Sequence, residues 1–155
     1  MIAVPRRLAR LVLVAALLVA AGAGCSRFRP PKKVTPVQRT MTTTGYCKCR
    51  KCCGWRRTWY GRAVYAYGPN KGKHKRVGVT ASGTKAKPGT IAADPARYPF
   101  GTIMYVPGYG YGRVEDRGSA IQGEHIDLFF KSHAEALAWG TQKKEVAVWF
   151  PRGSP

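Results

Sequence analysis

The aspartates in the second half of the chain are the residues best suited to acid–base chemistry. The chain of 155 residues has only seven acidic side chains, so the candidates are few. Asp116 lies in Val114-Glu-Asp-Arg-Gly118, at the end of an expected strand, and Asp127 lies in an apolar segment before Phe130. Burial raises the pKa of a carboxyl group and so suits it to act as a general acid. The alternative is a structural aspartate that caps a turn, and the residues alone do not separate the two.

Alternation around Asp127 predicts which way its side chain faces. Ile126, Leu128 and Phe130 would share one face of a strand, and Asp127 would share the other with its neighbours at 125 and 129. Asp is depleted in strands and costly to bury, so a buried Asp127 requires compensating partners. Asp94, followed by Pro95, instead has the sequence of a turn-initiating residue.

The second group that could do chemistry is a cysteine cluster, in which Cys47, Cys49, Cys52 and Cys53 fall within seven residues. In an exported protein an even number of cysteines favours disulfides, so we expect two, with the pairing open. The Cys49–Cys52 spacing also suits zinc, and four thiolates could complete a tetrahedral site. No histidine or carboxylate lies near the cluster in the sequence. On compartment alone we expect disulfides and no metal, with a zinc site as the alternative, and we expect no organic cofactor. A catalytic thiol is not expected, because nothing near the cluster could act as its base.

The first 24 residues predict a signal peptide. Three arginines precede an apolar run from Leu11 to Ala21, which is too short to span ~30 Å of hydrocarbon. Small residues and then Cys25 follow, as in a lipoprotein signal, although Gly22 stands where Leu is usual. We expect acylation at Cys25 and anchoring in a membrane, and ordinary cleavage beside an incidental cysteine is the alternative. Either reading predicts export to the cell envelope.

Charge is distributed unevenly along the chain, whose formal net charge is +20. Seventeen Lys or Arg and no acidic residue lie between Cys25 and Ala93, whereas acids and bases balance from Asp94 onward. Such a basic stretch favours polyanionic partners. In an exported protein these are anionic envelope polymers or lipid headgroups, and nucleic acid is not expected. Plain solubility and non-specific adhesion would account for the charge equally well.

The remaining segments predict one β-rich domain behind a tether. Residues 25–39 are basic and Pro-rich, the domain covers 40–150 with a basic insertion at about 56–79, and 151–155 form a tail. Short segments punctuated by Gly and Pro are typical of a barrel or sandwich. Ser132 and Glu135 form a capping box for one short helix that ends at Gly140. The expected strands are 40–46, 90–93, 102–106, 112–116, 125–130 and 146–150.

Short motifs in consistent order resemble the 3D (three-aspartate) domain. They include Thr44-Gly-Tyr-Cys47, Thr80-Ala-Ser-Gly-Thr84, Glu115-Asp-Arg-Gly118 and His125-Ile-Asp-Leu-Phe129. The resemblance covers 40–150 and implies an all-β fold, a small six-stranded double-psi β-barrel. That fold is similar to the catalytic domain of membrane-bound lytic transglycosylase A.

The resemblance also implies site residues. Asp127 would be the catalytic acid–base, Asp116 would position or polarise it, and Asp94 would shape the site. The loop Ser119-Ala-Ile-Gln-Gly123 resembles the family's Gly-Ala-Ile-Lys-Gly, with Ser119 in place of Gly and Gln122 in place of Lys. This loop and the strand after it would bind substrate through Ser119, Gln122, Gly123 and His125.

The resemblance implies a protein active on peptidoglycan glycan strands. The expected reaction is that of a lytic transglycosylase, which cleaves the MurNAc–GlcNAc β-1,4 bond to a 1,6-anhydro product with one aspartate. The competing hypothesis is a non-catalytic wall-binding module, since a fold alone does not settle function. An Asp127 partly buried beside Asp116 in a cleft would favour the enzyme, and an exposed Asp127 in a shallow groove would favour binding.

Overall fold

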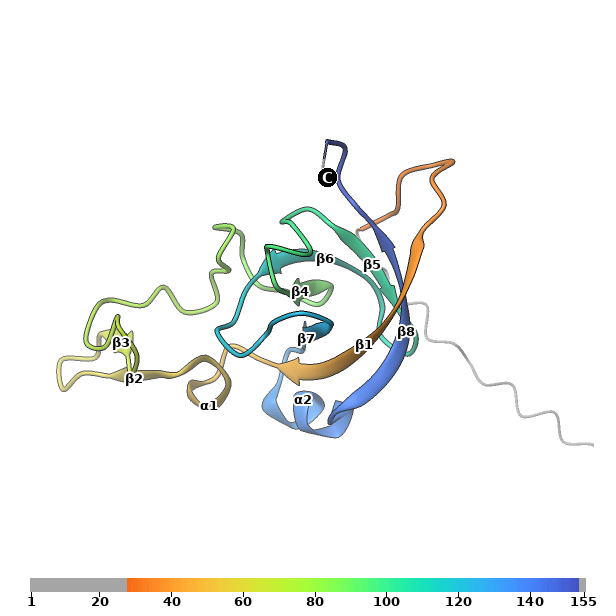
Figure 1. Ribbon diagram of the computed structural model, residues 1–155. Helices are drawn as coiled ribbons and strands as arrows, with labels where there is room; N and C mark the ends of the chain where they lie inside the picture. The colour runs from red at the N-terminus through yellow and green to blue at the C-terminus, as the bar shows by residue number, and fades with distance from the viewer. Residues whose placement is uncertain (1–27, 154–155) are drawn as a thin grey trace, which may run out of the picture.

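Six strands close into a barrel in the order β1-β7-β4-β6-β5-β8 (Figure 1), which confirms the expected all-β, six-stranded barrel. The computed structural model describes residues 28–153, so the expected signal peptide and Cys25 lie outside the described residues. The barrel strands are β1 (Val37–Tyr46), β4 (Thr90–Ala92), β5 (Ile103–Val106), β6 (Gly110–Asp116), β7 (His125–Phe129) and β8 (Gln142–Trp149).

The barrel contains two parallel strand pairs, β1 with β7 and β4 with β6, and its other neighbours are antiparallel. Strand β7 therefore lies between β1 and β4. In this register Asp127 is opposite Thr44 on one side and Ala92 on the other. The pairing thus fixes which side chains surround Asp127.

The barrel interior is an apolar core to which every barrel strand contributes. In β7, Ile126 and Leu128 are completely buried in this core, and Asp127 points to the opposite face. The expected alternation is therefore confirmed. Each large core side chain contributes about 1.5–3 kcal/mol by leaving water. The core consists of Met41, Ile91, Ala93, Tyr98, Met104, Val106, Val114, Ile126, Leu128, Val146 and Val148.

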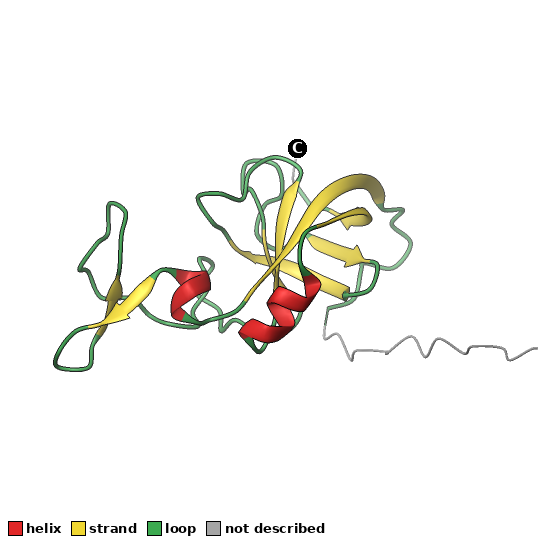
Figure 2. Ribbon diagram, turned by 90° about the horizontal axis from the view of Figure 1, so that it is seen from below, coloured by secondary structure: helices red, strands yellow, loops and turns green. Residues whose placement is uncertain are grey.

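Helix α2 (His133–Trp139) lies across the end of the barrel below β1 (Figures 1 and 2). Ser132 Oγ accepts from the backbone N–H of Glu135 at 3.2 Å, as the capping box predicts, and the Glu135 carboxylate accepts from the N–H of Lys131 at 3.2 Å. Trp139 Nε1 donates to Thr43 Oγ1 and so docks the helix on β1. Among the described residues, no helix has both the length and the apolar character required to cross a membrane.

Residues 48–88 leave the barrel between β1 and β4 and extend to one side of it (Figure 1). We call this segment the basic arm. It begins with α1 (Arg50–Cys53), a single helical turn that the sequence did not predict, and continues into the hairpin of β2 (Trp55–Arg57) and β3 (Ala63–Tyr65). The arm therefore has local structure where the sequence predicted a basic loop or hairpin.

Candidate active site

Three aspartates line one cleft of about 820 Å³. Asp94 follows β4, Asp116 ends β6, and Asp127 lies in the middle of β7. Because β4 pairs with both β6 and β7, the three carboxyl groups are gathered around this strand. The opposite wall of the cleft comes from the basic arm.

The floor of the cleft around Asp127 is apolar. Tyr46 and Phe129 meet edge to face, with ring centroids 5.4 Å apart, and they form a buried cluster with Ala92. This burial is the main cause that raises the pKa of Asp127 above its ordinary value, and the negative charge of Asp116 acts in the same direction. A raised pKa keeps more of the acid form available near neutral pH, as a general acid requires.

Thr44 is the direct partner of Asp127. Its Oγ1 donates to Asp127 Oδ1 at 2.9 Å and lies 3.0 Å from His125 Nε2. With the proton on Nε2, His125 donates to Thr44, which donates to Asp127. The Thr44 hydrogen bond and the His125 charge lower the pKa of Asp127, but burial outweighs them. His125 is therefore placed behind the carboxyl group and is not among the residues that line the cleft, so its expected contact with substrate stays a prediction.

Asp116 is held by three donors. Its Oδ1 accepts from the backbone N–H groups of Ala81 and Arg117, each at 2.9 Å, and its Oδ2 accepts from the Tyr46 hydroxyl at 3.0 Å. Burial and the charge of Asp116 both raise the pKa of Tyr46, so that the hydroxyl remains a donor. Asp116 consequently has one fixed orientation, and it binds the basic arm to the barrel through Ala81.

Asp94 organises a neighbouring loop. Its Oδ1 accepts from the N–H of Ala96 at 3.0 Å, as the turn sequence predicts, and its Oδ2 accepts from the N–H of Gly123 at 3.1 Å. The Gly123 bond, with a smaller contribution from Ala96, lowers the pKa of Asp94. Of the four residues expected to bind substrate, Ser119 and Gln122 line the cleft, whereas Gly123 is the backbone partner of Asp94.

Basic residues also line the cleft. Lys48, Lys75 and Arg76 line it from the basic arm, and Arg117 lines it from the barrel. A field of this sign attracts anionic ligands into the cleft. The acidic groups at the floor and the cations at the wall thus suit a ligand that carries both a reacting acetal oxygen and carboxylates.

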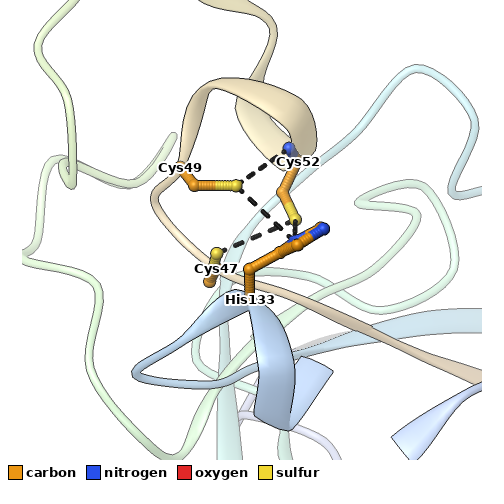
Figure 3. A group of neighbouring side chains, drawn as sticks. All are labelled: Cys47, Cys49, Cys52 and His133. Atoms are coloured by element: carbon orange, nitrogen blue, oxygen red, sulfur yellow. Dashed lines mark hydrogen bonds between the residues drawn. The ribbon is translucent and has the colours of Figure 1, made fainter. Parts of the chain in front are cut away.

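The two disulfides expected in the cysteine cluster are absent from the structure, in which Cys47, Cys49, Cys52 and Cys53 are free thiols. Cys47 Sγ and Cys52 Sγ are 3.8 Å apart, far beyond the ~2.05 Å of an S–S bond. A histidine that is distant in the sequence does reach the cluster. His133, at the start of α2, lies among three of the thiols (Figure 3).

Sequence reasoning gave no role to Thr44, Tyr46 or His133. The first two belong to the quoted motif Thr44-Gly-Tyr-Cys47, whose position before the cysteines was the available signal. Their pairing with aspartates 70 and 83 residues away depends on barrel closure. His133 had no signal beyond its place after a helix cap.

Comparison with known proteins gives matches over part of the chain. Residues 89–150 match the family model of the 3D domain. In Bacillus subtilis, the cell wall-binding protein YocH is 38% identical over 85 residues, covering 54% of this chain and 30% of YocH. YabE, which is named for cell wall shaping, is 39% identical over 75 residues, covering 46% of this chain and 18% of YabE. The chain thus matches less than a third of either relative's length.

Two solved structures are also similar. The crystal structure of MltA from E. coli has 20% sequence identity and a TM-score of 0.40, covering 51% of this chain and 30% of MltA. The structure of E. coli MltA with bound chitohexaose has 20% identity and a TM-score of 0.39, covering 46% and 28% of the two chains.

Proposed function

We propose that the protein acts on peptidoglycan in the cell envelope as a lytic transglycosylase, a proposal supported by the match of residues 89–150 to the 3D domain model. The observation that carries the proposal is the position of Asp127. It is half-buried, lines a cleft together with Asp116, and has a raised pKa. The names of YocH and YabE, which refer to the cell wall, support the substrate class.

The proposed reaction needs one acid–base group. Protonated Asp127 gives its proton to the glycosidic oxygen between MurNAc and GlcNAc, and the bond from that oxygen to C1 of MurNAc breaks. The resulting carboxylate then removes the proton from the C6 hydroxyl of the same MurNAc. Attack of the C6 oxygen on C1 closes a 1,6-anhydro ring and returns Asp127 to its acid form.

An intramolecular nucleophile explains how one carboxyl group suffices. Hydrolytic glycosidases use a second carboxylate as nucleophile or as base for water. In ring closure the attacking hydroxyl is already part of the substrate, so proximity lowers the barrier without a second base. Asp116 is held in one position by three hydrogen-bond donors and is not needed as a second base. Its negative charge would stabilise positive charge that develops at C1.

Asp94 supports the reaction from a distance in this proposal. Its bond to Gly123 holds the loop that presents Ser119 and Gln122 to the cleft. Because Gln122 is neutral, the carboxylates of muropeptides would be bound mainly by the cations of the basic arm. Asp94 is thus a positioning residue for the substrate wall.

Purified full-length protein, incubated with sacculi, provides the test. Mass spectrometry should detect 1,6-anhydro muropeptides with the parent protein and none above background with Asp127→Asn. Glu145→Gln is the matched control, because it removes an equal charge from an exposed position on β8 and should leave product release unchanged. Equal release from the parent and Asp127→Asn would reject Asp127 as the acid.

A wall-binding module is the second candidate. The tip of the arm's hairpin exposes Trp59, which is 95% accessible, and Tyr60, which is 60% accessible, and aromatic surfaces of this kind suit stacking on sugars. The name of YocH is consistent with binding. If the parent protein binds sacculi and releases no product, this candidate replaces the enzyme.

For localisation we propose an exported lipoprotein anchored through Cys25, with residues 25–39 as the tether. A single acyl chain binds membranes only marginally. The basic residues after Cys25 would add attraction to anionic headgroups or envelope polymers.

A further inference from the structure

Three cysteines and one histidine bring their ligand atoms together beside the base of the basic arm. The Sγ atoms of Cys47, Cys49 and Cys52 and a ring nitrogen of His133 all lie within 4.8 Å of one another. Figure 3 shows these side chains pointing toward a common centre from two separate parts of the chain. This cluster has no role in the reaction proposed above.

Three distances within the cluster are close to those of a tetrahedral metal site. Bonds of ~2.3 Å from zinc to sulfur and ~2.0–2.1 Å from zinc to nitrogen place two sulfurs about 3.8 Å apart and a sulfur and a nitrogen about 3.6 Å apart. In the structure Cys47 Sγ and Cys52 Sγ are 3.8 Å apart, and His133 Nδ1 is 3.3 Å from Cys52 Sγ and 3.7 Å from Cys49 Sγ. From this geometry we propose that Cys47, Cys49, Cys52 and His133 bind a structural zinc ion.

Local backbone structure presents the three sulfurs to one point. Cys47 follows the last residue of β1, and Cys49 caps the single turn of α1, which carries Cys52. The N–H of Cys52 donates to Cys49 Sγ at 3.4 Å, and such a bond stabilises a thiolate ligand. Gly54, in the left-handed conformation with φ of 54°, ends the turn and directs the chain into the arm.

His133 supplies the ligand that the local sequence lacks. It is the first residue of α2, and it lies 84 residues from Cys49 along the chain. Nδ1 is the nitrogen that faces Cys49 and Cys52, so the neutral ring that binds zinc would carry its proton on Nε2. Four protein ligands close the coordination sphere and leave no position for a catalytic water, which is typical of a structural site.

The surroundings match the charge of such a site. Zinc with three thiolates and a neutral imidazole has a net charge of −1. A cavity of about 590 Å³ next to the cluster is lined by five cations, Lys48, Arg57, Lys75, Arg76 and Lys131. Nearby positive charge favours thiolates and therefore metal binding. Tetrahedral sulfur and nitrogen ligands select zinc over magnesium or calcium, which prefer oxygen.

Cys53 is excluded from the site and provides a control. Its Sγ donates to the backbone oxygen of Cys47 at 3.1 Å, and it packs against the apolar floor formed by Tyr46, Ala92 and Phe129. The Cys53 thiol therefore has its own hydrogen-bond acceptor. The other three thiols have His133 as the fourth member of their cluster. Two local disulfides would have to draw Cys53 out of this contact.

The bound zinc would join the exit of β1 and the start of the arm to α2. The same arm provides Lys75 and Arg76 to the cleft wall and the Ala81 N–H to Asp116. The regular structure of the basic arm consists of two short strands and one helical turn, and zinc would hold the base of this arm. Its role is to fix the arm against the barrel.

Metal analysis of the reduced, full-length protein tests the proposal. Loading with zinc chloride followed by desalting should leave one zinc per chain in the parent and in Cys53→Ala. Cys49→Ser and His133→Ala should lose the bound zinc, whereas His74→Ala, which removes a histidine from the same cavity, should retain it. His133→Cys should also retain zinc, since a fourth thiolate can replace the imidazole.

Cobalt(II) gives a second readout that does not depend on variants. A tetrahedral site with three thiolates should give the parent a thiolate-to-cobalt charge-transfer absorption, and added zinc should abolish it. Zinc loading should also raise Tm in the parent and in Cys53→Ala but not in Cys49→Ser, because binding to the folded state stabilises it. Absence of zinc and of the cobalt absorption in the reduced parent would overturn the proposal, as would zinc retained equally by every variant. Two disulfides in protein isolated from the envelope without reductant would overturn it as well.

Discussion

Replacing Asp127 with Asn should make the protein more stable at neutral pH while removing its proposed activity. Burial raises the pKa of Asp127 in the folded protein, whereas in the unfolded chain an aspartate titrates at about 3.9. A carboxyl group with a raised folded pKa contributes stability below the unfolded pKa, and that contribution is lost as pH rises through the folded pKa. At neutral pH the ionised Asp127 therefore destabilises the fold, and the neutral amide of Asp127→Asn removes that cost.

The size of the effect follows from two opposed contributions at the site. Thr44 donates to Asp127 at 2.9 Å, and a hydrogen bond to a charged group is worth about 1.5–3 kcal/mol. Burial over the Tyr46–Phe129 floor outweighs it, because the net direction of the pKa is upward. The amide oxygen of Asn can still accept from Thr44. We expect the free energy of unfolding to rise by about 0.5–2 kcal/mol, the usual size of a single stabilising substitution.

Urea denaturation of the parent and Asp127→Asn, followed by tryptophan fluorescence at neutral and acidic pH, measures this difference. The stability advantage of Asp127→Asn should be largest at neutral pH and should vanish below about pH 3.9, where the unfolded aspartate is also protonated. Glu145→Gln, on the exposed side of β8, should show no comparable dependence. If Asp127→Asn were less stable than the parent at neutral pH, or if its advantage grew as pH fell, the assigned environment of Asp127 would be wrong.

Three further outcomes are expected. Asp127→Asn should slow muropeptide release by about 10²–10⁴-fold, the usual value of general acid–base catalysis. Asp116→Asn should retain more activity, because Asp116 raises the pKa of the acid and stabilises charge but transfers no proton; an equal loss in both variants would contradict this division. Leu128→Ala should lower the free energy of unfolding by about 2–5 kcal/mol in a urea titration, since Leu128 is fully buried in the barrel core, and a near-zero change would contradict its core position. Cys25→Ala should leave the protein in the soluble fraction of lysed cells, and a variant retained like the parent would exclude the lipid anchor.

The positions of the barrel strands could be predicted where apolar alternation marks them. Ile126 and Leu128 predicted both β7 and the outward direction of Asp127, and the capping box at Ser132 and Glu135 predicted α2. Strand β8 begins at Gln142, four residues before the expected start at 146. The sequence missed this part of the strand because its first four residues are polar, although they pair with β1. Hydrogen bonding extends the strand there without an apolar signal.

The cysteine cluster shows why local patterns could not predict the whole candidate site. Cysteine spacing and the expected compartment favoured disulfides, and the sequence offers no nearby histidine. His133 reaches the cluster only because β7 runs parallel to β1 and then leads into α2. A contact of this kind depends on barrel closure, so it appears in no window of sequence that contains the cysteines. The same holds for the Tyr46 hydroxyl on Asp116.

Three residues at the end of strand β1 make contacts that all depend on the same strand register. Thr44 donates to Asp127, Tyr46 donates to Asp116, and Cys47 contributes to the cluster at His133. Because side chains alternate along a strand, inserting or deleting one residue before Thr44 would turn Thr44 and Tyr46 to the wrong face, and it would displace Cys47, which follows the strand, at the same time. No such constraint applies to the exposed hairpin tip at Trp59 and Tyr60. Changes of chain length should therefore be lethal to function at the end of β1 and tolerated at the tip of the arm.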